Sequence, residues 1–275
     1  MKTPPHIDHL SLAGADVGTG GTYPSLGFQP VWDADLGNGD YYGLYWPYGR
    51  EKQEPIVCDM LHDEWRLQVA FSNTEIFIKW LALNDGQRGD HDVEDPGHVG
   101  RRFLETKPLL KNNPEEAISR LNAICDDFPE CAEYWYTLAT QLRRVGNRHM
   151  ACMAAIRAFT SNWAFGTPPE GTLKLIESGQ GLVEDPLVTR SGMLTTKYGG
   201  SKENRNYDIL QETITAYLSS PTPVLGLVLN QNYGYMMSSE TVSFQERYNF
   251  DSAIWLDEHS QLSAKILGDS RRHLT

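Results

Sequence analysis

The first third of the chain combines the hydrophobic alternation of short β-strands with the spacing of an α-helix. Three segments alternate apolar and polar residues between turn sequences: 41–46, 56–60 and 65–70. After them, the sequence SNTE at 72–75 has the cap residues and the acidic first turn that begin a helix, and 76–81 repeats apolar residues at helical spacing. We therefore predict a small antiparallel sheet covered by a helix, preceded by mostly irregular structure over 1–36.

A spacing of 34 residues marks the middle of the chain. Four positions recur at this interval: Ala117, Leu121, Ile124 and Pro129 are followed by Ala151, Ala155, Ala158 and Trp163. Thirty-four residues is the period of tetratricopeptide repeats, and Gly146 stands where that repeat turns between its helices. Small residues at 139 and 151 let two helices approach closely, and Trp135 is expected to fill the groove between them. Only about one and a half repeats fit, so the pattern predicts one clear hairpin over 129–163, preceded by one helix.

Beyond residue 165 the periodicity is weaker. Helices are predicted at 172–178, 207–218 and 252–267, and the last has both end signals, because Asp251 can cap it and Gly268 can stop it. The segment 224–229 is apolar on both faces, which fits either a buried strand or a buried helix segment.

The polar stretch 84–100, NDGQRGDHDVEDPGHVG, is typical of a linker or a long surface loop. It predicts a boundary between a sheet-containing domain at 1–90 and a helical domain at 100–275. The fold class that follows is α+β: a small antiparallel sheet covered by a helix, then a mostly helical C-terminal region.

Charge restricts the partners. The formal net charge is −12, and 31–99 holds fourteen acidic against five basic residues, which leaves that segment at about −9. An acidic protein is repelled by nucleic acid and by anionic lipid and attracted to a basic protein. The plainer interpretation is that the acidic residues only keep the protein soluble.

Compartment signals are few. We see neither a secretion signal in the first residues nor an apolar run long enough to span a bilayer. The four cysteines lack the paired spacing of zinc or redox sites, so we expect buried free thiols in a reducing cytoplasm. Together these observations predict a cytoplasmic protein without a membrane partner.

The segment 37–83 resembles the SUKH superfamily, a fold named after yeast cell-wall regulators and used widely as bacterial toxin-immunity proteins. The resemblance lies in a glycine-led strand at 39–41, a strand ending in a short acidic turn at 56–62, a strand carrying Trp65, and Phe71-Ser72-Asn73 before a helix with Phe77 and Leu81. It implies a domain of α+β fold that binds and blocks a cognate toxin, with no catalytic residue or cofactor to carry over.

The leading hypothesis is therefore a cytoplasmic immunity or antitoxin-like protein that blocks the active site of a toxic effector without catalysis. Aromatic side chains would anchor the partner and carboxylates would steer it. The predicted partner-binding residues are Asp40, Tyr42, Tyr48, Glu51, Glu54, Asp59, Asp63 and Glu64. No catalytic residue, metal ligand or cofactor is predicted, and Trp46, Trp65 and Trp80 are expected in the core.

Two alternatives remain open. A tetratricopeptide-like adaptor or chaperone would bind a peptide of a partner protein on the helical hairpin. A hydrolase would use Asp90, His91, Asp92 and His98 as metal ligands, although no regular element would fix their geometry.

Overall fold

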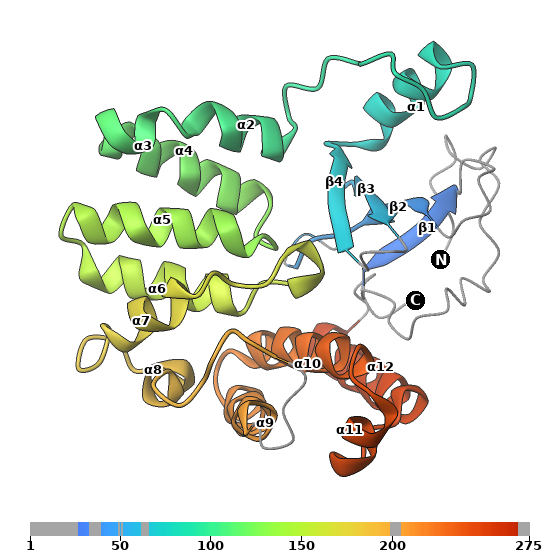
Figure 1. Ribbon diagram of the computed structural model, residues 1–275. Helices are drawn as coiled ribbons and strands as arrows, with labels where there is room; N and C mark the ends of the chain where they lie inside the picture. Colours follow the sequence, from blue (N-terminus) through green and yellow to red (C-terminus); the bar gives the residue numbers. More distant parts are fainter. Residues whose placement is uncertain are drawn as a thin grey trace. The chain divides into compact units, whose positions relative to one another are not determined.

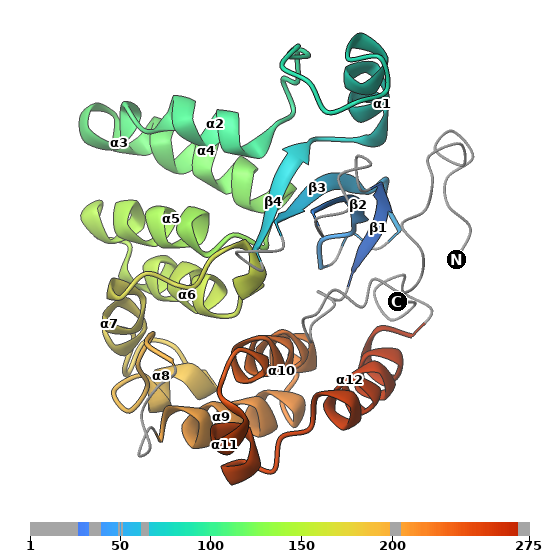
Figure 2. The same ribbon diagram turned by 45° about the vertical axis from the view of Figure 1, so that its right-hand side comes forward.

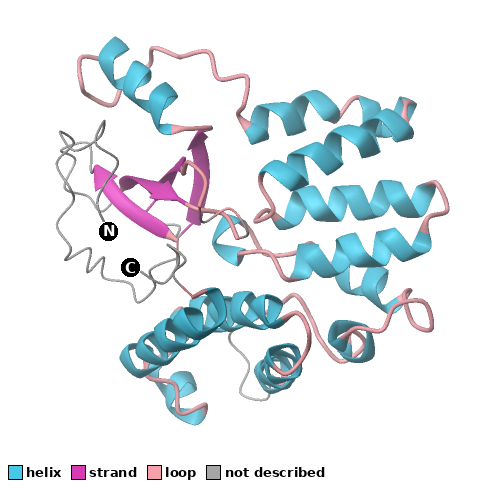
Figure 3. Cartoon of the chain, turned by 180° about the vertical axis from the view of Figure 1, so that it is seen from behind, coloured by secondary structure: helices cyan, strands magenta, loops and turns pink. Residues whose placement is uncertain are grey.

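The computed structural model describes residues 27–32, 40–48, 50, 52–61, 66–198 and 205–268 (Figure 1). The chain divides into two compact units, one formed by Met1–Leu104 with Asp269–Thr275 and the other by Glu105–Gly268. The division falls within helix α2 (Val99–Thr106), just after the polar stretch where the sequence predicts a boundary. In the described part of the chain the strands belong to the first unit, and the second unit is helical (Figure 3). The predicted α+β class is confirmed.

The first unit contains an antiparallel sheet with the strand order β1-β2-β3-β4. The strands are β1 (Phe28–Trp32), β2 (Tyr41–Tyr45), β3 (Ile56–Leu61) and β4 (Arg66–Phe71). Strands β2 to β4 are those predicted from the alternation. Strand β1 lies in the region expected to be mostly irregular, so for this strand the prediction was wrong. Its Pro30 donates no backbone hydrogen bond, and the β1–β2 register shifts between Pro30 and Trp32, which an edge strand tolerates.

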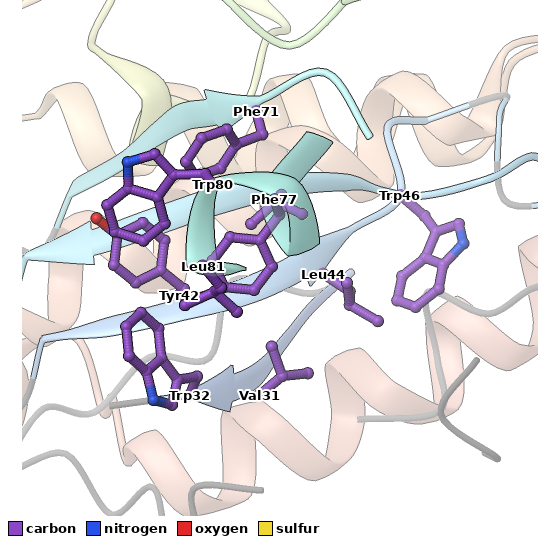
Figure 4. Packing of buried hydrophobic residues seen from close by; sticks show 10 residues of the cluster. Val31, Trp32, Tyr42, Leu44, Trp46, Phe71, Phe77, Trp80 and Leu81 are labelled. Atoms are coloured by element: carbon purple, nitrogen blue, oxygen red, sulfur yellow. The ribbon is translucent and has the colours of Figure 1, made fainter. Parts of the chain in front are cut away.

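Helix α1 (Thr74–Leu83) covers one face of the sheet, as predicted. The Asn73 side chain accepts a hydrogen bond of 3.0 Å from the backbone N–H of Ile76, which fixes the first turn of the helix. Five aromatic rings meet between α1 and the sheet, with centroids from 5.3 to 6.3 Å apart (Figure 4): Trp32, Tyr42, Phe71, Phe77 and Trp80. Trp46 and Trp80 are buried in this core, as expected, and Trp65 lies outside the described residues.

The second unit begins with antiparallel helices packed in sequence order (Figure 1). They are α3 (Leu109–Asn112), α4 (Pro114–Asp127), α5 (Ala132–Arg144) and α6 (Arg148–Phe159). Helices α5 and α6 form the predicted hairpin, and Gly146 adopts a φ of 86° at its turn. The buried aromatic residue of α5 is Tyr134. Trp135 is partly buried and donates its indole N–H to the Pro129 carbonyl at 3.0 Å, which links α5 to the turn before it.

Shorter helices connect this hairpin to the C-terminal bundle. They are η2 (Trp163–Phe165), α7 (Gly171–Glu177) and α8 (Pro186–Arg190). The buried Asn232 side chain joins η2 to the bundle, because its Oδ1 accepts from the Trp163 N–H at 2.9 Å and its Nδ2 donates to the Ser161 carbonyl at 2.7 Å. Loss of the Asn232 side chain would remove one hydrogen bond from each of these backbone groups, which lowers the free energy of unfolding.

The C-terminal bundle contains α9 (Asn206–Leu218), α10 (Pro223–Ser238), α11 (Val242–Arg247) and α12 (Ser252–Leu267). Helix α10 packs on both α9 and α12 (Figure 2). Residues 224–229 are therefore part of a helix, and their all-round apolar character reflects this double contact. Asp251 caps α12 through the Ala253 and Ile254 N–H groups, and Gly268 ends it, as predicted.

Candidate protein-binding site

Tyr42, a predicted anchor, belongs to the core of the first unit. Its side chain is 8% exposed, and its ring stacks on Phe77 at 5.5 Å beneath α1 (Figure 4). Alternation along β2 turns every second side chain toward the helix-covered face, and Tyr42 lies on that face. The prediction of a partner-facing Tyr42 was therefore wrong, because α1 already covers its ring.

Asp40 and Asp59, two predicted steering charges, pair with an arginine of the same unit. The Arg88 guanidinium lies 3.9 Å from Asp40 Oδ2 and 3.8 Å from Asp59 Oδ2, and its carbon is 5.7 Å from the Tyr42 ring centroid. The side chains of Asp40 and Asp59 are only 17% and 18% exposed. Both carboxylates thus hold the segment that carries Arg88 and present little charge to a partner.

Burial changes the protonation equilibria of this cluster. Desolvation raises the pKa of the Asp59 carboxyl; Arg88 lowers it in part, and Asp40 raises it further. Desolvation also raises the pKa of Tyr42, with Asp59 adding to the shift. The ion pairs with Arg88 and its contact with the Tyr42 ring stabilise the unit. The removal of the two carboxylates from water opposes this stabilisation.

The remaining predicted residues divide into two groups. Glu54 is exposed and accepts a 2.8 Å hydrogen bond from the Thr74 hydroxyl at the start of α1, and Tyr48 is partly buried in the turn after β2. Glu51, Asp63 and Glu64 lie outside the described residues. Those of the predicted residues that the structure describes, Asp40, Tyr42, Tyr48, Glu54 and Asp59, are thus not gathered on one exposed face.

The stretch after α1 is an anchored loop. We call residues 84–98 the acidic loop. At its start, Asn84 Nδ2 donates to the His91 carbonyl and Asn84 Oδ1 accepts from the His91 N–H, both at 3.1 Å. Asp95, 3% exposed, accepts from the Ser72 N–H at 2.8 Å and from the Ser72 hydroxyl at 2.5 Å. These bonds fold the loop back onto the end of β4.

His98 fixes the far end of the loop. Its Nε2 lies 3.1 Å from the Val69 carbonyl, while its Nδ1 accepts from the Arg101 N–H at 3.3 Å. A ring whose Nδ1 accepts must carry its proton on Nε2, where it can donate to the Val69 carbonyl. His98 is therefore a structural link from the loop to the sheet.

These anchors leave the carboxylates between them at the surface. Asp85, Asp90, Asp92 and Glu94 are all exposed. Leu83, at the end of α1, is 55% exposed beside them, and a left-handed turn at Asp85 and Gly86 directs the chain into the loop. The acidic loop is thus a preformed surface with four carboxylates and an apolar neighbour. These acids belong to the charge excess of 31–99, and the hydrogen bonds of Asn84, Asp95 and His98 fix the loop that carries them.

The metal-ligand hypothesis has no geometric support. Among the residues that the structure describes, no group of three or more His, Cys, Asp or Glu could hold a metal ion. His98 of the proposed ligand set serves the sheet instead. The four cysteines are free and buried, as expected.

No helix in the described ranges is both long and apolar enough to cross a bilayer.

Fold and site define a two-unit α+β protein, with a sheet unit that presents an anchored acidic loop and a unit built from helical hairpins. The chain belongs to the YfbP family. Residues 14–90 match the YfbP N-terminal domain and residues 197–275 match the YfbP C-terminal domain. It is 37% identical over 283 residues to "Uncharacterized protein YfbP" of Escherichia coli (strain K12), and the match covers 100% of both chains. No solved structure matches the chain.

Proposed function

We propose that this chain is a cytoplasmic immunity or antitoxin-like protein that binds a basic toxic effector and blocks its active site without catalysis. The observation that carries the proposal is the acidic loop, which holds four exposed carboxylates on a hydrogen-bonded frame beside Leu83. The resemblance of residues 37–83 to the SUKH superfamily gives the class of partner. This segment contains β2, β3, β4 and α1, the elements that carry the loop.

Charge and order act together in this proposal. Exposed carboxylates attract a basic enzyme over roughly a Debye length, about 8 Å at physiological salt, and raise the association rate. Because the loop is anchored before binding, little conformational entropy is lost when the partner docks. Leu83 would supply apolar contact at the margin of the charged surface.

The first test is recovery of the partner. Cross-linking in the native cell followed by mass spectrometry should return one basic protein at one-to-one stoichiometry, with cross-links to the acidic loop. Expression of that protein alone should stop growth, and co-expression of this chain should restore it. Recovery of many partners that share a short peptide motif would contradict the proposal.

A charge-matched pair of variants then locates the contact. In the first variant Asp85, Asp90 and Asp92 become Asn and Glu94 becomes Gln. In the control, four exposed acids of the helical unit become Gln: Glu115, Glu177, Glu184 and Glu212. Both lose four negative charges, so net charge cannot distinguish them. We expect the loop variant to lower the association rate about tenfold or more at low salt and the control to change it little. Equal effects would rule out the acidic loop as the contact.

A second candidate function is a tetratricopeptide-like adaptor, favoured by exposed apolar side chains on α6 and in the turn before it. Val145, Met150 and Met153 are 45%, 48% and 37% exposed there, and flexible methionines suit binding of varied peptides. Substitution of Met150 and Met153 by Glu should abolish binding if the adaptor function is correct. The same pair should leave binding to the acidic loop unchanged.

A further inference from the structure

The helical unit contains a cavity that the proposed function does not use. It has a volume of about 460 Å³ and lies between α9, α10, α12 and the segment that joins α11 to α12. The lining residues belong to 211–258, within the part of the chain that matches the YfbP C-terminal domain. A cavity of this volume falls within the range of small-molecule sites.

One wall of the cavity is a row of aromatic rings. Tyr233 and Phe250 meet edge to face with centroids 6.0 Å apart, and Phe250 lies 6.3 Å from Trp255. Trp255 in turn stacks on the buried His259 at 5.0 Å. Tyr233, Phe250 and Trp255 line the cavity, but Tyr233 and Trp255 are only 5% and 7% exposed. The accessible aromatic surface comes from the partly buried Phe250 and from Tyr248, which also lines the cavity.

Local backbone and packing features hold this wall in place. Gly234 has no side chain, which allows the Trp255 ring to lie against α10; an added Cβ there would stand 2.2 Å from Trp255 Cζ2. Asn249 adopts a φ of 50° between Tyr248 and Phe250. On the opposite side, the Asn230 amide nitrogen is 2.8 Å from His259 Nδ1, so the ring that supports Trp255 also positions a polar lining residue.

The charge of the lining is negative. Asp251 and Glu258 carry carboxylates, and none of the described lining residues is Lys, Arg or His. Asp251 Oδ1 accepts hydrogen bonds from the Ala253 and Ile254 N–H groups in the first turn of α12. The unit itself has nineteen acidic against fourteen basic residues between 105 and 268. Anions are therefore disfavoured in this cavity and cations are favoured.

We propose that this cavity binds a small organic cation, an alkylammonium or alkylguanidinium ion. Aromatic faces attract such ions and also contact their alkyl carbons, while a carboxylate at the edge pairs with the charge. In this arrangement the partly exposed rings of Tyr248 and Phe250 contact the alkyl chain and the cation, and the buried rings of Tyr233 and Trp255 support them. Glu258, exposed on α12, pairs with the charged group.

Isothermal titration calorimetry on the full chain tests this with isosteric probes. n-Butylguanidinium should bind, its neutral isostere n-butylurea should bind at least about fivefold more weakly, and butyrate should not bind. Added salt should weaken binding of the cation alone. Equal binding of the urea, or no binding of either n-butylguanidinium or n-butylammonium, would overturn the proposal.

Three exposed-site variants locate the binding and are expected to fold normally. Glu258→Gln should weaken n-butylguanidinium about three- to fivefold. Thr215→Lys, which adds a positive charge at the cavity edge, should abolish it. The control Glu246→Gln, on the exposed surface of α11 outside the lining, should leave affinity unchanged. If Glu258→Gln and Thr215→Lys both bind like the parent chain, the cation is held elsewhere and the assignment of the cavity is wrong.

Discussion

Gly234 gives the sharpest test of the packing within the helical unit. In an open position of a helix, Gly→Ala stabilises by about 0.5–1 kcal/mol, because glycine loses more backbone entropy on folding. At Gly234 the new Cβ would stand 2.2, 2.4 and 2.5 Å from three atoms of the Trp255 ring. Carbon atoms rest about 3.5–4.0 Å apart, so the ring must move by roughly 1.3 Å or more. We predict that Gly234→Ala destabilises the protein despite the better helix propensity.

The magnitude follows from the surroundings of the ring. Trp255 is 7% exposed and stacks on His259, so it cannot turn into solvent without losing buried contacts. Overpacking of this kind costs about 1–3 kcal/mol, and complete loss of a buried Trp side chain sets an upper limit of about 3–5 kcal/mol. After the gain in helix propensity is subtracted, we expect a net loss of about 1–2 kcal/mol in the free energy of unfolding.

A double-mutant cycle measured by urea denaturation separates the clash from other effects. Trp255→Leu removes the ring, so Gly234→Ala/Trp255→Leu should be less destabilised than the sum of the single variants by about 1 kcal/mol or more. Gly226 on the same helix is the matched control, because its added Cβ would approach Leu218 and not Trp255. Gly226→Ala combined with Trp255→Leu should therefore be additive. A stabilising Gly234→Ala, or additivity in the first cycle, would refute the reasoning.

Three further predictions concern stability. Asn232→Ala should lower the free energy of unfolding by about 2–4 kcal/mol, because it leaves the Trp163 N–H and the Ser161 carbonyl without their side-chain partner; a loss below about 1 kcal/mol in urea denaturation would contradict this. Asn73→Ala should cost about 1 kcal/mol by removing the cap of α1, with faster hydrogen exchange at the Ile76 amide as its local sign. Burial raises the pKa of Asp59 in the native state above its ordinary value of about 3.9. Between the unfolded-state pKa and the higher native pKa, the native state binds more protons than the unfolded state, so the free energy of unfolding falls as pH rises. Asp59→Asn should remove this fall, and a variant with the slope of the parent chain would show that another group titrates.

Elements whose signals are local in the sequence formed as predicted. The alternation in 41–46 and the caps of α12 each depend on neighbouring residues, and both elements formed as predicted. Strand β1 was missed because Pro30 in a glycine-rich context does not read as a strand; its place at the sheet edge is a property of the fold. Helix α10 stayed ambiguous because its apolar faces are set by α9 and α12, which are distant in the sequence.

The site was harder to predict because its contacts are long-range. Alternation places Tyr42 on one face of β2, and Asp40 directly precedes the strand, but the sequence does not say that α1 will cover this face or that Arg88 will return to it. Composition also fails to distinguish an anchored loop from a linker. The difference lies in pairs such as Ser72 with Asp95 and Val69 with His98, each more than twenty residues apart.

The acidic loop separates the residues that hold its shape from those that face solvent. Asn84, Asp95 and His98 make the hydrogen bonds, whereas Asp90, Asp92 and Glu94 are exposed and can change with little effect on stability, typically within about 0.5 kcal/mol. Asp85 is also exposed, but its φ of 54° restricts replacement to residues such as Asn or Gly. Selection can therefore alter charge and shape at the outward positions without disturbing the frame. A surface built in this way can vary over evolutionary time, and it can be re-engineered by substitution at positions 90, 92 and 94 without rebuilding the loop.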